Sequence, residues 1–266
     1  MDLQKNANRF LGFADVYDQA RPSCPPEICA LAERYSGHRI DRVADLGCGT
    51  GLSTRIWEGI AREIVGVDPS PDMLKVARKR SADHPAFHWI QRFAHDTGLP
   101  SAVFDTVVCS QSFHWMEPHT TLQEAARLLR EDGVFLTVDA DWPPVCDWQA
   151  ELAYQALFRQ VRQLEQTHPM IKESFCRFPK EHHLDNIQKS GHFRYVREVL
   201  LQHTEPGNAD RFLTLALSQG GLQAILRHAP ELILPWLQEF ETFLRSHWGK
   251  REIPFTFCYR IRIGIR

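Results

Sequence analysis

The sequence of 266 residues lacks the features that mark several large classes of protein. No uninterrupted apolar run approaches the ~18 residues that a membrane-spanning helix needs, so we expect no membrane insertion. The first six residues, MDLQKN, lack the apolar centre of a signal peptide. The seven cysteines are odd in number and form no C-x-x-C pair, which is typical of reduced thiols. We therefore expect a cytoplasmic protein without a structural metal.

An excess of charge of one sign is also missing. The formal net charge is −2, whereas domains that bind nucleic acid usually carry a strongly basic face. No internal repeat or low-complexity segment is present. The sequence is 43% hydrophobic and 24% charged, which is an ordinary balance for a globular protein with a full core. We expect one globular domain over 1–266 that binds no nucleic acid and is a monomer or homodimer.

Short apolar runs alternate with helical stretches over the first half of the chain. The strand-like runs are 43–46, 64–67, 87–93, 104–109 and 134–138. Helices are expected at about 52–60, 71–82 and 119–130, the last one followed by a stop signal at Gly133. This alternation predicts right-handed crossovers and a parallel sheet that is covered by helices on both faces.

The pattern changes after Asp139. Pro143 and Pro144 cannot continue a central strand, because proline lacks the N–H donor of the ladder. An amphipathic helix is expected at about 147–166, and helical stretches at about 207–248. Two further strand-like runs occupy 193–201 and 255–265, and the second alternates isoleucine with Arg260 and Arg262, which indicates unlike faces. The sequence thus predicts a core over 25–140, helical insertions over 141–192 and 202–253, and a closing strand over 254–266.

A glycine-rich loop, DLGCGTG, follows the first predicted strand at residues 45–51. Glycines let the backbone turn sharply and come close to a ligand. A helix start just after the loop offers free N–H groups and partial positive charge to an anionic or polar group. Asp68 ends the second predicted strand, 17 residues beyond Gly51, where such folds place an acid against ribose hydroxyls.

The spacing of this loop separates three cofactor classes. A phosphate-binding P-loop ends in Gly-Lys-Ser/Thr, whereas this chain has Gly51-Leu52-Ser53. A dinucleotide fingerprint is G-x-G-x-x-G, and here the third glycine comes one residue early. A nicotinamide-dependent reductase is therefore a weaker alternative. A tight turn without any ligand would require only one glycine.

Residues 43–51, VADLGCGTG, resemble the first motif of the class I S-adenosylmethionine-dependent methyltransferases. The following GVDPS at 66–70, with Met73 one turn later, strengthens the resemblance, which covers roughly 10–140. The resemblance implies an enzyme with an α/β fold: a Rossmann-like, seven-stranded, mostly parallel sheet whose last strand is antiparallel. It also implies helical cap insertions after strands 5 and 6, which would form the acceptor site.

The same resemblance assigns roles around the cofactor. It implies that Asp68 holds the ribose hydroxyls, that Met73 lies on the adenine face, and that Asp45 faces the methionyl part. The remaining residues of the implied cofactor site are Gly47, Cys48, Gly49, Pro69, Ala94, His95, Asp96, Ser110 and Gln111. The family usually has an acid followed by alanine after the third strand, whereas this chain has Ala94-His95-Asp96, which leaves the residue that meets the adenine amino group open.

Residues 14–25, ADVYDQARPSCP, are similar to an N-terminal lid segment in the type 11 branch of this family. The similarity implies that residues 1–24 form a lid, with Tyr17 closing over the cofactor. Arg21 would pair with the methionine carboxylate through a charge-assisted hydrogen bond. An ordinary surface role for each of these two residues stays open.

The segment CSQSFHW at 109–115 follows the fourth predicted strand and resembles a small-molecule branch of the family that includes trans-aconitate-type enzymes. Ligands of open parallel sheets bind beyond the carboxyl ends of the strands. His114 is a candidate general base, because imidazole titrates near ~6.5. The alternative is a structural histidine. Trp115 and Trp142 are candidate walls of the acceptor site.

The resemblance favours a small-molecule acceptor. A protein or RNA methyltransferase and a non-catalytic S-adenosylmethionine-binding protein are the alternatives. Four residues that could be imagined as metal ligands have spacings that match no compact metal motif: His168, Cys176, His182 and His183.

Overall fold

The computed structural model describes residues 5–6, 21–22 and 24–266. The chain forms two compact units where the sequence predicts one domain. The sheet unit comprises Ser23–Ala140, Arg177–Leu201 and Tyr259–Arg266 as far as these are described. The helical unit comprises Asp141–Cys176, Gln202–Cys258 and the described residues of Met1–Pro22.

Seven strands form one sheet in the order β3-β2-β1-β4-β5-β7-β6. Their bounds are β1 Arg42–Leu46, β2 Glu63–Val67, β3 Phe87–Ile90, β4 Phe104–Ser110, β5 Leu129–Ala140, β6 Tyr195–Gly207 and β7 Ile253–Ile265. Strands β1 to β5 pair in parallel with their neighbours, whereas β7 runs antiparallel to β5. The predicted fold class, a mostly parallel seven-stranded sheet with an antiparallel last strand, is confirmed.

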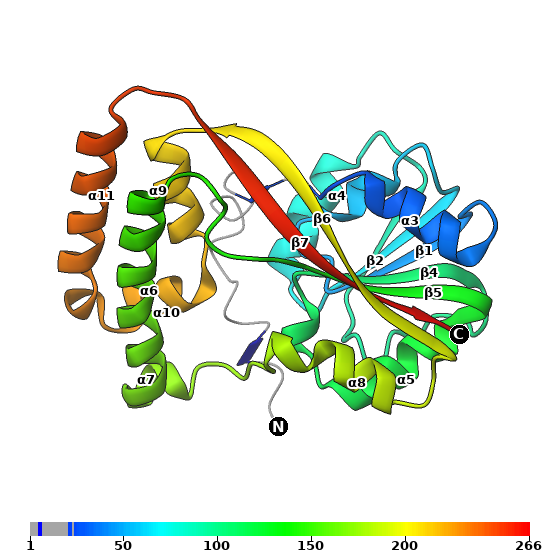
Figure 1. Cartoon of the computed structure of the whole chain (residues 1–266). Coiled ribbons are helices and arrows are strands. Elements are labelled where there is room, and N and C mark those ends of the chain that lie inside the picture. The colour runs from blue at the N-terminus through cyan, green and yellow to red at the C-terminus, as the bar shows by residue number, and fades with distance from the viewer. Residues whose placement is uncertain (1–4, 7–20, 23) are drawn as a thin grey trace. The chain divides into compact units, whose positions relative to one another are not determined.

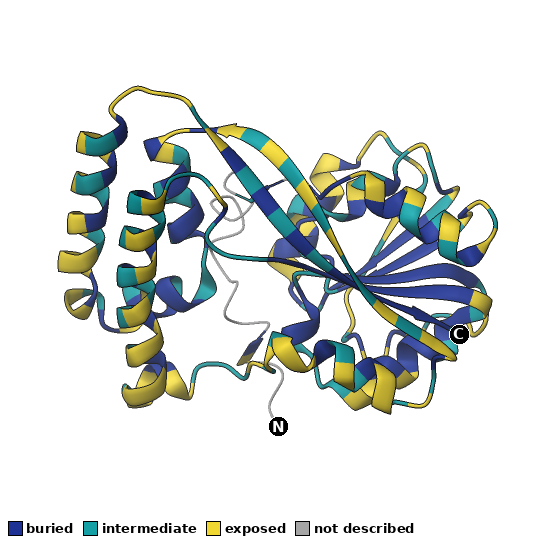
Figure 2. Cartoon of the chain, viewed as in Figure 1, coloured by how far each residue is buried: buried dark blue, intermediate teal, exposed yellow. Residues whose placement is uncertain are grey.

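Helices cover both faces of this sheet. Helices α3 (Glu27–Ser36) and α4 (Pro71–Arg80) lie on one side, and α5 (Pro118–Leu128) and α8 (His183–Lys189) on the other (Figure 1). The central strands are buried along almost their whole length (Figure 2). Apolar side chains on both faces explain why these strands occur as continuous apolar runs in the sequence.

The helical unit contains α6 (Trp148–Thr167), α7 (Pro169–Lys172), α9 (Ala209–Leu217), α10 (Gly220–His228) and α11 (Leu234–Trp248). Asp147 caps α6 by accepting hydrogen bonds from the N–H groups of residues 149 and 150, and it also accepts one from the indole of Trp248. The buried aromatic rings of this unit contact one another: Tyr154, Phe212, Phe240, Trp248 and Phe255. None of the described helices has the length and hydropathy needed to cross a membrane.

Three boundaries differ from the sequence predictions. The helix expected at 52–60 is only a short 3₁₀ helix, η1 (Thr54–Trp57), because left-handed glycines at 51 and 59 flank it. The helix expected to reach 130 ends at Leu128, and β5 begins at the next residue. Residues 177–192 of the first predicted insertion belong to the sheet unit, where Ile187 packs into the core.

Candidate functional site

In the glycine loop after β1, Gly47 and Gly51 are covered by side chains, whereas Gly49 is open. Gly47 has φ +71°, and a Cβ there would lie 2.6 Å from Cβ of Ser112. Gly49 has φ +55°, and a Cβ there would meet no atom within 4 Å. The left-handed backbone requires glycine at both positions. The open face at Gly49 is where a ligand can approach the backbone.

Asp45 ends β1 beneath this loop and is 1% exposed. Its Oδ2 accepts a hydrogen bond of 2.6 Å from Oγ1 of Thr54, whereas its Oδ1 has no hydrogen-bond partner among the described residues. The pKa of Asp45 is raised to about 7, mainly by burial; the Thr54 hydroxyl opposes this shift and the nearby carboxylate of Asp68 adds to it. A buried carboxylate oxygen without a partner is costly, so this position suits a cation or an N–H donor of a ligand.

Asp68 follows β2 and supports the loop from the neighbouring strand. Its Oδ2 accepts the N–H of Gly49 at 2.9 Å and its Oδ1 accepts the N–H of Ser70 at 2.8 Å. Burial raises the pKa of Asp68 to about 6, although these two N–H groups oppose the shift. An ionised carboxylate offers about four acceptor positions, so further ones are left for ligand hydroxyls.

The other predicted cofactor residues lie in the same unit with different exposure. Met73 is buried in the first turn of α4, which Ser70 caps, and Ala94 is buried after β3. His95 and Asp96 are exposed, and the N–H of Asp96 donates to the carbonyl of Phe93 in a tight turn. Which of these residues meets the adenine ring stays a prediction, as do the roles of Cys48, Pro69 and Ser110.

The segment after β4 is fastened to the glycine loop. Oγ of Ser112 donates a 2.7 Å hydrogen bond to the carbonyl of Leu46, at the end of β1. Gln111 has φ +52°, an unusual conformation for a residue with a side chain. The 3₁₀ helix η2 (Phe113–Trp115) follows directly, so His114 and Trp115 lie at the same sheet edge as Gly47.

A group of charged and imidazole side chains gathers around Asp139, at the carboxyl end of β5. We call it the carboxyl-edge cluster; its members are His114, Asp139, Lys180, His183 and Arg262. Oδ2 of Asp139 contacts Nδ1 of His183 at 3.1 Å and Nη1 of Arg262 at 2.9 Å. Oδ1 contacts Nζ of Lys180 at 2.9 Å and Nδ1 of His114 at 3.7 Å. Lys180 and the imidazoles of His114 and His183 hold the pKa of Asp139 well below its usual range against the effect of burial.

The sequence predicts only His114 among the members of this cluster. Its side chain is 9% exposed, and burial lowers its pKa to about 3, with Lys180 acting in the same direction and Asp139 opposing. The expectation that His114 titrates near its ordinary value is therefore revised, because the buried ring is neutral at physiological pH. The sequence feature that could have identified Asp139 as a site residue is its position at the end of a predicted parallel strand.

Two predicted residues lie in the helical unit, where they contact each other. The guanidinium carbon of Arg21 is 4.8 Å from the ring centroid of Trp142, and Nη2 of Arg21 donates to the carbonyl of Ser218 at 3.0 Å. Their roles toward cofactor and acceptor stay predictions. Tyr17 lies outside the described residues. Within the described part of the chain, no group of three or more His, Cys, Asp or Glu could hold a metal ion.

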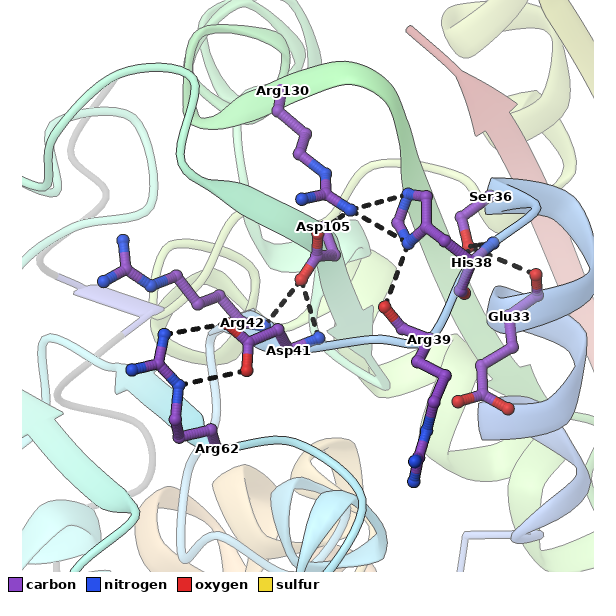
Figure 3. Close-up of polar contacts among 9 residues, drawn as sticks. All are labelled: Glu33, Ser36, His38, Arg39, Asp41, Arg42, Arg62, Asp105 and Arg130. Atoms are coloured by element: carbon purple, nitrogen blue, oxygen red, sulfur yellow. Dashed lines mark hydrogen bonds and ion pairs between the residues drawn. The ribbon is translucent and has the colours of Figure 1, made fainter.

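The opposite edge of the sheet carries a second charged network, shown in Figure 3. Oδ2 of Asp105, at the start of β4, accepts the backbone N–H groups of Asp41 and Arg42, each at 2.7 Å. Oδ1 of Asp105 lies 2.5 Å from Nη2 of Arg130, which also contacts the ring of His38. We call these residues, with Arg62 paired to Asp41, the amino-edge cluster. These contacts join the amino ends of β1, β2, β4 and β5.

Comparison with known proteins identifies the sheet unit. Residues 44–137 match the model of the "Methyltransferase domain" family. A "Probable S-adenosylmethionine-dependent methyltransferase" of Saccharomyces cerevisiae is 30% identical over 125 residues, 45% of this chain and 42% of that protein. A "Malonyl-[acyl-carrier protein] O-methyltransferase" of Enterobacter lignolyticus is 34% identical over 147 residues, 54% of this chain and 57% of that protein. The chain thus spans about half the length of these relatives.

Solved structures share the fold over most of the chain. The structure of a "Putative Type II Methyltransferase" from Anaeromyxobacter dehalogenans has a TM-score of 0.69 at 23% identity, covering 92% of this chain and 97% of that one. The [4+2]-cyclase SpnF has a TM-score of 0.57 at 15% identity, covering 99% and 97%. Residues 44–137 are thus similar to the methyltransferase domain of S-adenosylmethionine-dependent enzymes, and the chain shares its fold with a solved methyltransferase structure.

Proposed function

We propose that the protein transfers the methyl group of S-adenosylmethionine to a small-molecule acceptor. The observation that carries this proposal is the pair of buried carboxylates, Asp45 and Asp68, at the ends of adjacent parallel strands around the open backbone of Gly49. Oδ1 of Asp45 requires a cation or donor, which the ammonium group of the cofactor would provide. Asp68 keeps acceptor positions for the ribose hydroxyls.

The bound cofactor supplies a methyl group on a positively charged sulfur, which is a good leaving group. The chain therefore has to align the acceptor and exclude water, and needs a base only for an acceptor that carries a proton. Because Ser112 fastens η2 to β1, His114 and Trp115 are held at the sheet edge that carries the glycine loop. A neutral imidazole can accept a proton there, and the indole of Trp115, 4.6 Å from the His114 ring, can form a wall.

Three observations support a small-molecule acceptor. The net charge of −2 provides no general attraction for a polyanion. The relative named for malonyl-[acyl-carrier protein] O-methylation supports an oxygen acceptor on a small acyl group. The trans-aconitate-type resemblance of the segment after β4 supports the same class. Because a protein named as a [4+2]-cyclase has the same fold, the fold alone does not require methyl transfer. The alternative is a protein that binds S-adenosylmethionine without transferring its methyl group.

Calorimetry tests the cofactor and a labelling screen tests the acceptor. We expect S-adenosylmethionine and its demethylated product to bind in the micromolar range, and NADH not to bind. Binding of NADH without either adenosyl ligand would overturn the proposal. With methyl-labelled cofactor, label should enter the small-molecule fraction of a cell extract. Label in the RNA or protein fraction would identify those acceptors instead, and tight binding without any labelled product would show a non-catalytic protein.

A further inference from the structure

Two side chains of the carboxyl-edge cluster face the same oxygen of Asp139. Nζ of Lys180 lies 2.9 Å from Oδ1, which is an ion-pair distance. Nδ1 of His114 lies 3.7 Å from the same oxygen, too far for a hydrogen bond, and has no hydrogen-bond partner among the described residues. His114 is therefore next to the carboxylate while Lys180 is bound to it.

The other oxygen of Asp139 is fully engaged and keeps the carboxylate in place. Oδ2 accepts from Nδ1 of His183, which is completely buried, and from Nη1 of Arg262, which is 4% exposed. Nε of Arg262 also pairs with Glu198 at 2.8 Å. Asp139 consequently cannot turn away, so any exchange of partners takes place at Oδ1.

Lys180 is the member of the cluster that can leave. Its side chain is 30% exposed, whereas those of His114 and Asp139 are 9% and 3% exposed. Beyond Asp139, its Nζ contacts Oε1 of Gln111 at 3.3 Å, and Nε2 of this strained Gln111 is buried without a partner among the described residues. The lysine is a flexible cation at the sheet edge where the acceptor is expected, beside an amide that lacks an acceptor of its own.

We propose that Lys180 is a displaceable counter-ion of Asp139, and that an acceptor carrying an anionic group draws it away and so leaves Oδ1 to His114. Nδ1–H of His114 then donates to Asp139, which makes Nε2 the basic nitrogen of the ring. During transfer the acceptor atom bonds to the methyl carbon, its proton moves to Nε2, and the carbon–sulfur electron pair stays on sulfur. The negative charge of Asp139 stabilises the imidazolium that forms on His114. The acceptor class is an anion with a separate hydroxyl or amine.

The groups that face His114 come from several elements. They are Asp139 on β5, Lys180 before α8, His183 on α8, and, through Asp139, Arg262 on β7 with Glu198 on β6. The charges of Arg262 and Glu198 neutralise each other, and His183 is hydrogen-bonded to Asp139. Burial is the largest influence that opposes protonation of the His114 ring, followed by Lys180 and, more weakly, His183. Replacing Lys180 by a neutral residue therefore changes the charge next to His114 and leaves the other groups of the cluster in place.

NMR titration of His114 in the full chain, without acceptor, tests the inference. In Lys180→Met the pKa of His114 should rise by about 1–3 units, the usual effect of an uncovered carboxylate on a neighbouring group. Lys180→Arg keeps the cation and should titrate like wild type. The double variant Lys180→Met, Asp139→Asn should return to the low value. Lys189→Met is the control, because Lys189 is 76% exposed and pairs with Asp185 on the surface of α8.

An unchanged His114 titration in Lys180→Met overturns the inference, as does a rise that persists in the double variant. Lys180→Gln is a second neutral variant if Lys180→Met does not fold, and cofactor binding verifies folding in each case. The inference depends on the proposed function for its reaction, but the titration needs no acceptor, so the two can fail separately. With an anionic acceptor, Lys180→Met should raise KM roughly 10–100-fold and change kcat by less than about threefold.

Discussion

Asp105 and Asp139 are both buried carboxylates in the sheet unit, one at the start of β4 and the other at the end of β5. Asp105 accepts from two backbone N–H groups and pairs with Arg130. Among the described residues, the carboxylate of Asp139 contacts side chains and no backbone donor, and one of its oxygens lies between Lys180 and His114. Backbone donors cannot leave without unfolding a strand end, whereas side chains can exchange.

The difference follows the polarity of a parallel sheet. Ligands of such sheets approach the carboxyl ends of the strands, so partners that move are useful there. The amino ends face no ligand, and their polar groups are best satisfied permanently. The comparison therefore separates residues that stabilise the fold from residues that act in the reaction. Four variants can test this separation, in order of decreasing effect.

Replacing His114 should have the largest effect, and it should act on turnover alone. His114→Ala removes the proposed base and should lower turnover roughly 10²–10⁴-fold, with cofactor affinity within a few-fold of wild type. Turnover would be measured from pH 5.5 to 8.5 beside His119→Ala, an exposed histidine on α5. Flat profiles with rates that agree within a few-fold would assign His114 to the wall of the acceptor site, and alignment alone would then drive the reaction.

Asp105→Ala should have the opposite signature, with a loss of stability and no loss of binding. Two backbone N–H groups lose their acceptor, and at ~1–3 kcal/mol for each buried unsatisfied donor the free energy of unfolding should fall by roughly 2–6 kcal/mol. Denaturant titration measures this loss. Asp41→Ala removes an exposed ion pair with Arg62 and is the matched control with little expected effect. A loss of cofactor affinity without a loss of stability in Asp105→Ala would contradict the assignment of Asp105 to fold stability.

Asp68→Ala should weaken cofactor binding by roughly 1.5–3 kcal/mol, about 10–150-fold, because it removes hydrogen bonds to a charged acceptor. Calorimetry with S-adenosylmethionine measures the change, and Asp72→Ala, exposed on α4, is the control. Since Asp68 also holds the N–H groups of Gly49 and Ser70, part of the loss reflects a looser loop. Affinity equal to wild type would remove Asp68 from the site.

The smallest effect concerns the pH dependence of stability. The pKa of Asp45 is raised to about 7, so the folded protein keeps this proton where the unfolded chain, at 3.8, has lost it. The free energy of unfolding therefore falls as the pH rises from about 4 to about 7, because Asp45 has to ionise in the folded protein. Asp45→Asn cannot ionise, so its Tm should rise by a few degrees relative to wild type between pH 5 and 8. A constant difference in Tm over this range would contradict the assignment.

The sequence predicts the sheet well because its information is local. The strands in the first half of the chain contain short apolar runs, and the glycine loop with Asp68 marks the first two strand ends. The prediction of an α-helix after the loop is wrong, because Gly51 and Gly59 adopt left-handed conformations that the hydrophobic periodicity does not reveal. The position of residues 177–192 depends on the burial of Ile187, which is likewise a tertiary effect.

The carboxyl-edge cluster could not be predicted in the same way. Lys180 and Arg262 lie 41 and 123 residues beyond Asp139, and no local pattern joins them. The alternation of isoleucine and arginine near the C-terminus correctly indicates a strand with unlike faces. It does not reveal that Arg262 is buried, because a charged side chain is buried only when a partner from another segment neutralises it.

Trp89 links two glycines that are far apart in the sequence. Its indole, held by a 2.8 Å hydrogen bond to Oγ of Ser81, would lie 2.3 Å from a Cβ on Gly66 and 2.6 Å from one on Gly51. Gly51 needs its left-handed backbone in any case, but Gly66 has an ordinary φ and is kept small mainly by the indole, with Sγ of Cys48 2.9 Å from the same Cβ position. Positions 66 and 89 should therefore show epistasis. Gly66→Ala should be more harmful beside tryptophan than beside a leucine at position 89, so homologues are expected to change both residues together.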